Sequence, residues 1–190
     1  MAVAVRLAAV ATLAALVAAG GAVRVVRAHG DLEYTVKAAF LYNFLSFIEW
    51  GAAPQSGTVP FRVCIIGADP FGKTLDDLVK GERVGQRPIE VARPADEEAA
   101  ASCQVVFVAR TDDARLPTIV RMAAGKGVLI VGESAKVLPA CGAIAFVQEG
   151  ERLRFDVNIN AIRRQGLRAS SKLLRVARDA SSRYTQCDSQ

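Results

Sequence analysis

The chain has 190 residues, with 24 Lys and Arg against 19 Asp and Glu, a formal net charge of +5 and a single histidine. Three of the arginines lie in the first 28 residues, which leaves 21 basic against 19 acidic side chains, a net charge of +2, beyond them. This small excess, without a basic run, excludes a nucleic-acid-binding protein. Because the one histidine is His29, Ser-His and Cys-His catalysis are excluded in the body of the chain.

The first 28 residues have the pattern of a secretory signal peptide. Arg6 precedes an uncharged run over residues 7–23, and small residues follow this run. A basic start, a short apolar core and a small-residue exit are typical of exported proteins. We expect cleavage after Ala28, with Ala22 as the alternative. An uncleaved anchor is less favoured, since a spanning helix needs about 20 apolar residues. The remaining residues, 29–190, suit one globular domain.

Residues 31–50 predict one amphipathic helix, with Asp31 as a candidate N-cap. Val36, Phe40, Phe44 and Phe47 recur at helical spacing, and further apolar residues widen this face. Its polar side is expected to consist of the residues Glu33, Lys37, Ser46 and Glu49. The wide aromatic face is interpreted as core packing. The alternative is that part of it meets a partner protein.

Beyond residue 60, apolar runs alternate with helical patterns. Strands are predicted at residues 61–67, 88–93, 103–109 and 128–132; helices are predicted up to Lys80 and at 96–102 and 112–124. Residues 143–148 and 153–157 then predict a hairpin, and helices at 159–165 and 170–183 close the chain. Continuous apolar strands between helices are typical of a parallel sheet covered on both faces. The predicted fold is α/β: a Rossmann-like, doubly wound, mostly parallel sheet with a C-terminal antiparallel hairpin and closing helices.

Residues 67–74 spell a phosphate-binding loop, Gly-x-x-x-x-Gly-Lys-Thr, between a predicted strand and a helix. An NTPase would also need an acidic residue ending a neighbouring strand, where the chain has Ala109 and Arg110. We therefore interpret the two glycines as shaping a turn, with Pro70 starting the helix. No catalytic residue, metal site or cofactor is predicted.

A second hypothesis is a small-ligand-binding module. Doubly wound sheets bind ligands at the carboxyl ends of their strands. The candidate ligand-binding residues at this edge are Gly67, Asp69, Lys73 and Arg110.

Four cysteines in an exported chain favour disulfides. Cys64 lies in the first predicted strand and Cys103 starts the third. With strand order 2-1-3 these strands are neighbours, and their Cα atoms could approach to roughly 5–6 Å, within disulfide range. The alternative is two buried thiols. Cys141 and Cys187 could form a second bridge or stay free.

Four segments, in order along almost the whole chain beyond the leader, resemble the YfiR family of periplasmic regulators. The most specific are Arg154-Phe155-Asp156-Val157-Asn158 and the block at residues 166–177, which contains Ser170-Ser171-Lys172-Leu173-Leu174. The other two segments are residues 34–44 and residues 64–72, and the second of these contains the turn Asp69-Pro70-Phe71-Gly72. In the family this turn recurs while the next two residues vary, so Lys73-Thr74 is a chance match.

The resemblance implies a non-enzymatic periplasmic protein that inhibits an inner-membrane diguanylate cyclase by binding its periplasmic domain. It also implies a homodimer, sequestration by an outer-membrane lipoprotein, and a response to redox state. Cys64 and Cys103 correspond to one family cysteine pair. Cys141 lies near a second pair, but no cysteine follows it closely in this chain.

Overall fold

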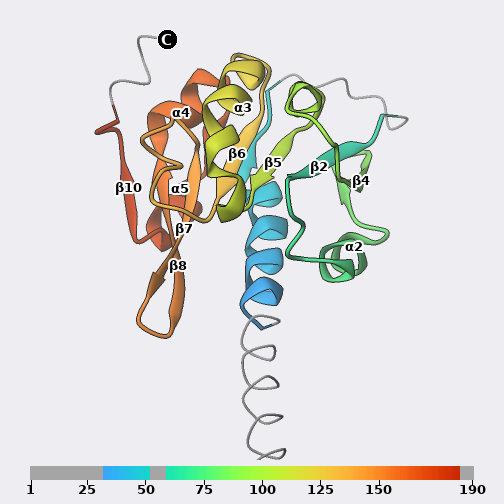
Figure 1. The fold of residues 1–190 in the computed structure, drawn as a ribbon, viewed down its shortest axis with the longest axis horizontal. Helices are drawn as coiled ribbons and strands as arrows, with labels where there is room; N and C mark the ends of the chain where they lie inside the picture. The colour runs from blue at the N-terminus through green and yellow to red at the C-terminus, as the bar shows by residue number, and fades with distance from the viewer. Residues whose placement is uncertain (1–31, 52–58, 185–190) are drawn as a thin grey trace, which may run out of the picture.

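A mixed sheet of eight strands forms the centre of the molecule, in the order β10-β8-β7-β6-β5-β2-β4-β3 (Figure 1). The computed structural model describes residues 32–51 and 59–184. The predicted signal peptide, Asp31, His29 and Cys187 lie outside these residues. The strands of the sheet are β2 (Phe61–Ile66), β3 (Arg83–Val84), β4 (Arg87–Ala92), β5 (Val105–Val108), β6 (Leu129–Gly132), β7 (Ile144–Glu149), β8 (Arg152–Asn158) and β10 (Asp179–Ser181).

The strands β4, β2, β5, β6 and β7 pair in parallel, whereas β3 and β8 run antiparallel to their neighbours β4 and β7. All four residues of both β5 and β6 are buried. This agrees with their continuous apolar sequence, because a central parallel strand is covered on both faces. The prediction of an α/β fold with a mostly parallel sheet is confirmed.

Helices cover both faces of the sheet. The first helix (residues 32–47) and helix α2 (Lys73–Val79) pack on one face with α4 (Ile159–Arg164) and α5 (Ser171–Val176). Helix α3 (Leu116–Ala123) and the 3-10 helix η1 (Glu98–Ser102) pack on the other face. On the first face an aromatic cluster fixes the first helix: Phe44 packs with its ring centroid 5.0 Å from that of Phe155 and 6.0 Å from that of Phe146.

Three predicted helices differ from the structure. The first ends at residue 47, because Ile48–Glu49 forms strand β1 and pairs with β9 (Arg168–Ala169). The helix expected at 112–124 is divided into a 3-10 helix, η2 (Arg110–Arg115), and α3.

The helix predicted over residues 170–183 is wrong beyond Val176. The chain instead forms β10, which pairs in parallel with the end of β8. Arg178 directs this change: its N–H donates to the Phe155 carbonyl oxygen, and its guanidinium binds Asp156. Pairing with the edge of the sheet outweighs helix propensity here.

The register places β7 and β8 beyond the carboxyl edge of the sheet. Only Ile144 and Ala145 of β7 pair with β6, whereas β7 pairs with β8 as far as Glu149 and Arg152. The far part of this antiparallel pair extends past the sheet, alongside the start of the first helix (Figure 1). We call the projecting residues 146–154 the ribbon. The carboxyl edge, the ribbon and the first helix together form the region in which a functional site is expected.

Candidate functional site

The carboxyl edge of the sheet has a topological switch point between β2 and β5. After β2 the chain continues to β4 on one side, then returns to β5 on the other. Ligands of doubly wound proteins bind in the crevice at such a point. Here Gly67 follows β2 and Asp112 lies in η2, the 3-10 helix that follows β5, so these residues determine whether the crevice is open.

The crevice is filled by the carboxylate of Asp112. The Ala68 N–H donates to Asp112 Oδ2 at 3.2 Å, and Thr111 Oγ1 donates to the same oxygen at 2.7 Å. A Cβ placed on Gly67 would lie 2.1 Å from this carboxylate, and Gly67 has a φ of +92°. The glycine is therefore needed both for its backbone conformation and for the close approach of Asp112. The protein's own carboxylate stands where a bound anion would stand.

We expect Gly67→Ala to destabilise the protein by about 3 kcal/mol, because it combines a clash with a left-handed φ. Gly81→Ala is the matched control: Gly81 has a φ of +80° and nothing within 4 Å of an added Cβ, so it carries the conformational strain alone, about 1–2 kcal/mol. Urea unfolding of both variants measures the difference. Equal losses in the two variants would show that Asp112 does not occupy the crevice.

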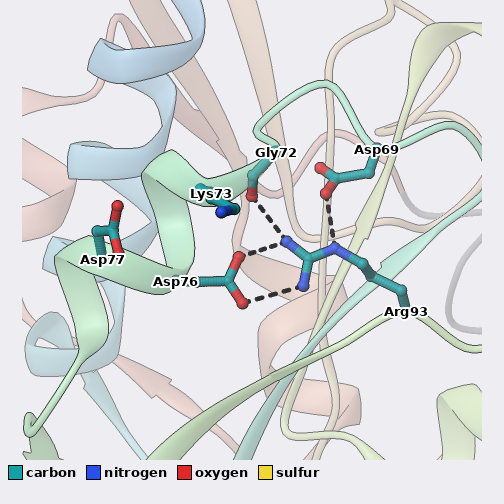
Figure 2. A pocket seen from close by; sticks show the side chains of 6 residues that line it. All are labelled: Asp69, Gly72, Lys73, Asp76, Asp77 and Arg93. Atoms are coloured by element: carbon teal, nitrogen blue, oxygen red, sulfur yellow. Dashed lines mark hydrogen bonds and ion pairs between the residues drawn. The ribbon is translucent and has the colours of Figure 1, made fainter.

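The loop that spells the phosphate-binding motif is likewise held by the chain's own side chains (Figure 2). Asp69 Oδ1 accepts the Phe71 N–H at 2.8 Å, and Asp69 Oδ2 accepts Arg93 Nε at 2.6 Å. Arg93 also donates to the Gly72 carbonyl oxygen at 2.8 Å and pairs with Asp76. The hydrogen bonds from Arg93 lower the pKa of Asp76, and the same contact raises the pKa of Arg93.

These contacts support the interpretation of residues 67–74 as a turn. A phosphate-binding loop presents free backbone N–H groups at the start of a long helix. In this loop the N–H groups of Ala68, Phe71 and Thr74 already donate to Asp112, Asp69 and the Phe71 carbonyl oxygen. Helix α2 has only seven residues. The expectation that Pro70 starts this helix is wrong, because the helix begins at Lys73 and Pro70 lies within the turn.

The four candidate ligand-binding residues do not meet at one point. Asp69 and Lys73 line a shallow pocket of about 510 Å³ with Arg93 (Figure 2). Gly67 lies under Asp112, and the Arg110 guanidinium donates to the Glu133 carbonyl oxygen at 2.9 Å. Ligand binding through this set stays a prediction.

A buried ion pair lies farther along the same edge. Lys37 of the first helix is 2% exposed and binds Glu133, which follows β6 and is 4% exposed. Glu133 Oε1 also accepts the Arg110 N–H at 3.0 Å and the Tyr34 hydroxyl at 3.3 Å. A second carboxylate, that of Glu33, lies 2.5 Å from Lys37 Nζ. The carboxylate of Glu133 thus joins the first helix to the ends of β5 and β6.

The pKa values of Lys37 and Tyr34 are both shifted by burial and by the contacts with Glu133. Burial acts to lower the pKa of Lys37, but its hydrogen bonds to Glu133 and Glu33 outweigh burial, so the pKa is raised. Burial and the nearby charge of Glu133 raise the pKa of Tyr34. At neutral pH the lysine is therefore charged and the tyrosine is neutral, which is the state in which Tyr34 donates to Glu133.

The expectation that Lys37 lies on the polar side of the helix is wrong. It shares a buried stripe with Leu41, Phe44 and Ile48, at intervals of three or four residues. A charged residue inside an apolar stripe was the signal for a buried partner, since a buried charge needs an opposite charge. Glu133, directly after a continuous apolar strand, was the matching signal.

A groove with a volume of about 780 Å³ lies between the first helix and the ribbon. The helix contributes Leu32, Val36 and Phe40, and the ribbon contributes Leu153. Leu32 is 65% exposed and Val36 is 37% exposed. The exposed side of this helix also carries the uncharged residues Thr35, Ala39, Asn43 and Ser46. Charged side chains border these apolar residues: Glu33 on the helix, and Glu151, Arg152 and Arg154 on the ribbon. Exposed apolar side chains with charged groups around them are suited to contact with another protein.

The predicted bridge between neighbouring strands is present. Cys64 and Cys103 form a disulfide with a Cα–Cα distance of 6.0 Å, and they are 1% and 2% exposed. Cys141 is also disulfide-bonded. Its pairing with Cys187 stays a prediction, because Cys187 lies outside the described residues.

The most distinctive sequence segments have structural roles. Phe155 belongs to the aromatic cluster, and Asp156 binds Arg178 of the β10 segment. Asn158 is fully buried and accepts the Ala161 N–H at 3.1 Å, which caps α4. Ser170 accepts the Leu173 N–H at 3.3 Å and caps α5. These side chains hold the last third of the chain against the sheet.

The fold and these contacts define a small mixed α/β domain that fills its own strand-edge crevice and leaves a helix–ribbon groove open. Within residues 32–51 and 59–184, no helix is long and apolar enough to cross a bilayer. The model of the YfiR/HmsC-like family matches residues 34–178, and the chain belongs to this family. Family members are regulators, and membership is consistent with periplasmic regulation of diguanylate cyclase signalling.

Proposed function

We propose that the protein binds the periplasmic sensor domain of an inner-membrane diguanylate cyclase and holds the cyclase inactive. The observation that carries the proposal is the family match over residues 34–178. A regulator that binds the inactive form of the cyclase dimer more tightly shifts the equilibrium toward that form. Export by the N-terminal leader would place the protein in the compartment of the sensor domain. Homodimerisation and sequestration by an outer-membrane lipoprotein belong to the same proposal.

The helix–ribbon groove is the surface that we assign to the cyclase. Its apolar residues Leu32 and Val36 are exposed, and exposed apolar side chains next to a groove are typical anchors of protein interfaces. The Lys37–Glu133 pair beneath the helix holds this surface in place without taking part in the contact.

Deletion of the gene is expected to raise intracellular cyclic-di-GMP, and the wild-type gene should restore the original level. A Val36→Glu variant should fail to restore it, since a buried charge at an anchor residue of an interface weakens binding by about 2–4 kcal/mol. Leu78→Glu is the matched control, because Leu78 is 38% exposed but lies on α2, away from the groove. The measurement is the cellular cyclic-di-GMP concentration.

Unchanged cyclic-di-GMP in the deletion strain, with the cyclase expressed, would overturn the proposal. Restoration by both variants would leave the repressor role intact but remove the groove from the contact.

A further inference from the structure

Positive charge is concentrated at one end of the molecule. Residues 159–184 contain seven basic side chains and one acidic side chain, Asp179. Residues 32–158 contain 14 basic and 16 acidic side chains. The small net charge of the whole chain therefore hides a strongly basic segment beside a nearly neutral body.

Most of these charges face solvent. The exposed basic residues of the segment are Arg163, Arg168, Lys172, Arg175, Arg178 and Arg183. Three of them make ion pairs: Arg168 with Glu49, Arg178 with Asp156, and Arg183 with Asp179. The other three, Arg163, Lys172 and Arg175, have no acidic partner among the residues that the structure describes.

The basic residues belong to elements that pack against one another. Helix α4 contacts β9 and β10, and α5 contacts β10. Figure 1 shows α4, α5 and β10 together at one end of the sheet, with α2 and β4 at the other. We call this end, residues 159–184, the basic end. It is distinct from the helix–ribbon groove, which lies at the carboxyl edge between the first helix and the ribbon.

We propose that the basic end binds an anionic phospholipid surface. Exposed Lys and Arg side chains are attracted to anionic headgroups, and arginine is well suited to phosphate because its guanidinium donates two parallel hydrogen bonds. Val176 is 57% exposed beside Arg175 on α5. An apolar side chain next to cations is the arrangement found on protein segments that lie at a membrane interface.

An acidic protein is the less favoured occupant. Stable protein interfaces have an apolar core, but Val176 is the one large apolar residue that is exposed within residues 159–184. Binding there must be mainly electrostatic and must depend on the density of charge opposite it. A bilayer surface supplies phosphates over a wide area, so the exposed cations without ion pairs, Arg163, Lys172 and Arg175, do not need to meet one compact acidic patch. Contact at this end would leave the helix–ribbon groove free for another protein.

Vesicle sedimentation tests the proposal with the soluble chain, released from cells without detergent. The wild-type chain should bind vesicles of phosphatidylglycerol mixed with phosphatidylcholine, but not vesicles of phosphatidylcholine alone. Binding should weaken as salt is added, since salt screens exposed charges. Each cation near an anionic surface increases partitioning roughly fivefold, so loss of three cations alone decreases partitioning by about 100-fold. Replacement by glutamates should decrease it further, because the anionic surface repels the new carboxylates.

The variant Arg163→Glu/Lys172→Glu/Arg175→Glu removes the three cations without ion pairs. The matched control, Lys80→Glu/Arg83→Glu/Lys136→Glu, changes the net charge equally at exposed positions outside the basic end. Thermal unfolding of both variants checks that each is folded. The first variant should lose vesicle binding, and the control should retain binding to within a few-fold of wild type.

Any one of three results would overturn the proposal. The wild-type chain does not bind anionic vesicles at low salt, both triple variants lose vesicle binding equally, or the variant of the basic end still binds vesicles as wild type does. A different pair of results would indicate that the basic end binds an acidic protein instead. In that case the wild-type chain does not bind vesicles, and the variant Arg163→Glu/Lys172→Glu/Arg175→Glu does not lower cyclic-di-GMP in cells. No cyclase is present in the vesicle assay, so its outcome is independent of the proposed repressor function.

Discussion

Lys37→Met is expected to destabilise the protein by about 3–5 kcal/mol, because removal of one partner of a buried ion pair leaves the other charge uncompensated. Lys37 is 2% exposed, and Glu133 would remain buried with only the Tyr34 hydroxyl and the Arg110 N–H as donors. Since most domains are stable by about 5–15 kcal/mol in total, this loss is a large share. Urea unfolding at neutral pH is the measurement.

The double variant Lys37→Met/Glu133→Gln is the decisive comparison. Glutamine keeps an oxygen to accept the Arg110 N–H but carries no charge, so the double variant should be more stable than Lys37→Met alone. Arg168→Met is the surface control: the Arg168–Glu49 pair is 82% and 68% exposed and should contribute little. If the double variant is no more stable than Lys37→Met, the two residues are not coupled and the assigned role of the pair is wrong.

The contribution of the Lys37–Glu133 pair to stability depends on pH in a defined direction. The pKa of Lys37 is raised above its ordinary value of 10.5. A raised folded-state pKa stabilises the protein fully below the unfolded value, and this contribution is lost only as the pH rises through the folded value. Stability measurements near neutral pH therefore record the whole contribution of the pair, and any loss from Lys37 should begin in strongly alkaline solution.

The ion pair also explains how the groove keeps its shape. The start of the first helix extends past the sheet beside the ribbon, where few residues of the sheet can hold it. Lys37 and Glu133 connect this part of the helix to the end of β6, and the Tyr34 hydroxyl donates to the same carboxylate. A buried pair can fix one geometry in this way even where it adds little net stability. If the groove binds the cyclase as proposed, Lys37→Met should weaken repression more than its loss of stability alone would.

The sheet could be predicted from the sequence because its central strands are short, continuous apolar runs, which are typical of buried parallel strands. The neighbouring positions of β2 and β5 then followed from the strand order, and with them the Cys64–Cys103 bridge. In contrast, β10 has three residues and no periodic signal. Its position depends on Arg178 and Asp156, which are 22 residues apart, and no local pattern encodes such a contact.

The site was harder to predict than the fold for a related reason. The motif at residues 67–74 has a recognisable spelling, but its function depends on whether Asp112, more than 30 residues later, fills the crevice. The basic end has no basic run: its exposed cations are three to five positions apart, and folding of α4, α5 and β10 brings them to one end of the sheet. Chemistry assembled from distant parts of the chain is not visible in any short window of sequence.

Replacing both Cys64 and Cys103 by alanine is expected to destabilise the protein by about 4 kcal/mol. The bridge closes a loop with a sequence separation of 39 residues, and the entropy of the unfolded chain increases by roughly this amount when such a loop is opened. The alanines would also leave small voids between β2 and η1, since both half-cystines are almost fully buried. Urea unfolding of the oxidised wild type and of the double variant measures the loss.

The same burial predicts that this bridge does not respond to mild reductants in the folded protein. A thiolate must reach a sulfur atom to exchange with it, and Cys64 and Cys103 are 1% and 2% exposed. Reduction should therefore proceed only as fast as the protein unfolds, and trapping of free thiols by alkylation followed by mass spectrometry measures this rate. Reduction of the bridge in the native state, faster than unfolding, would contradict the prediction. A bridge that opens only on unfolding stabilises the sheet and cannot itself sense redox state, so any redox response would have to act through another part of the chain.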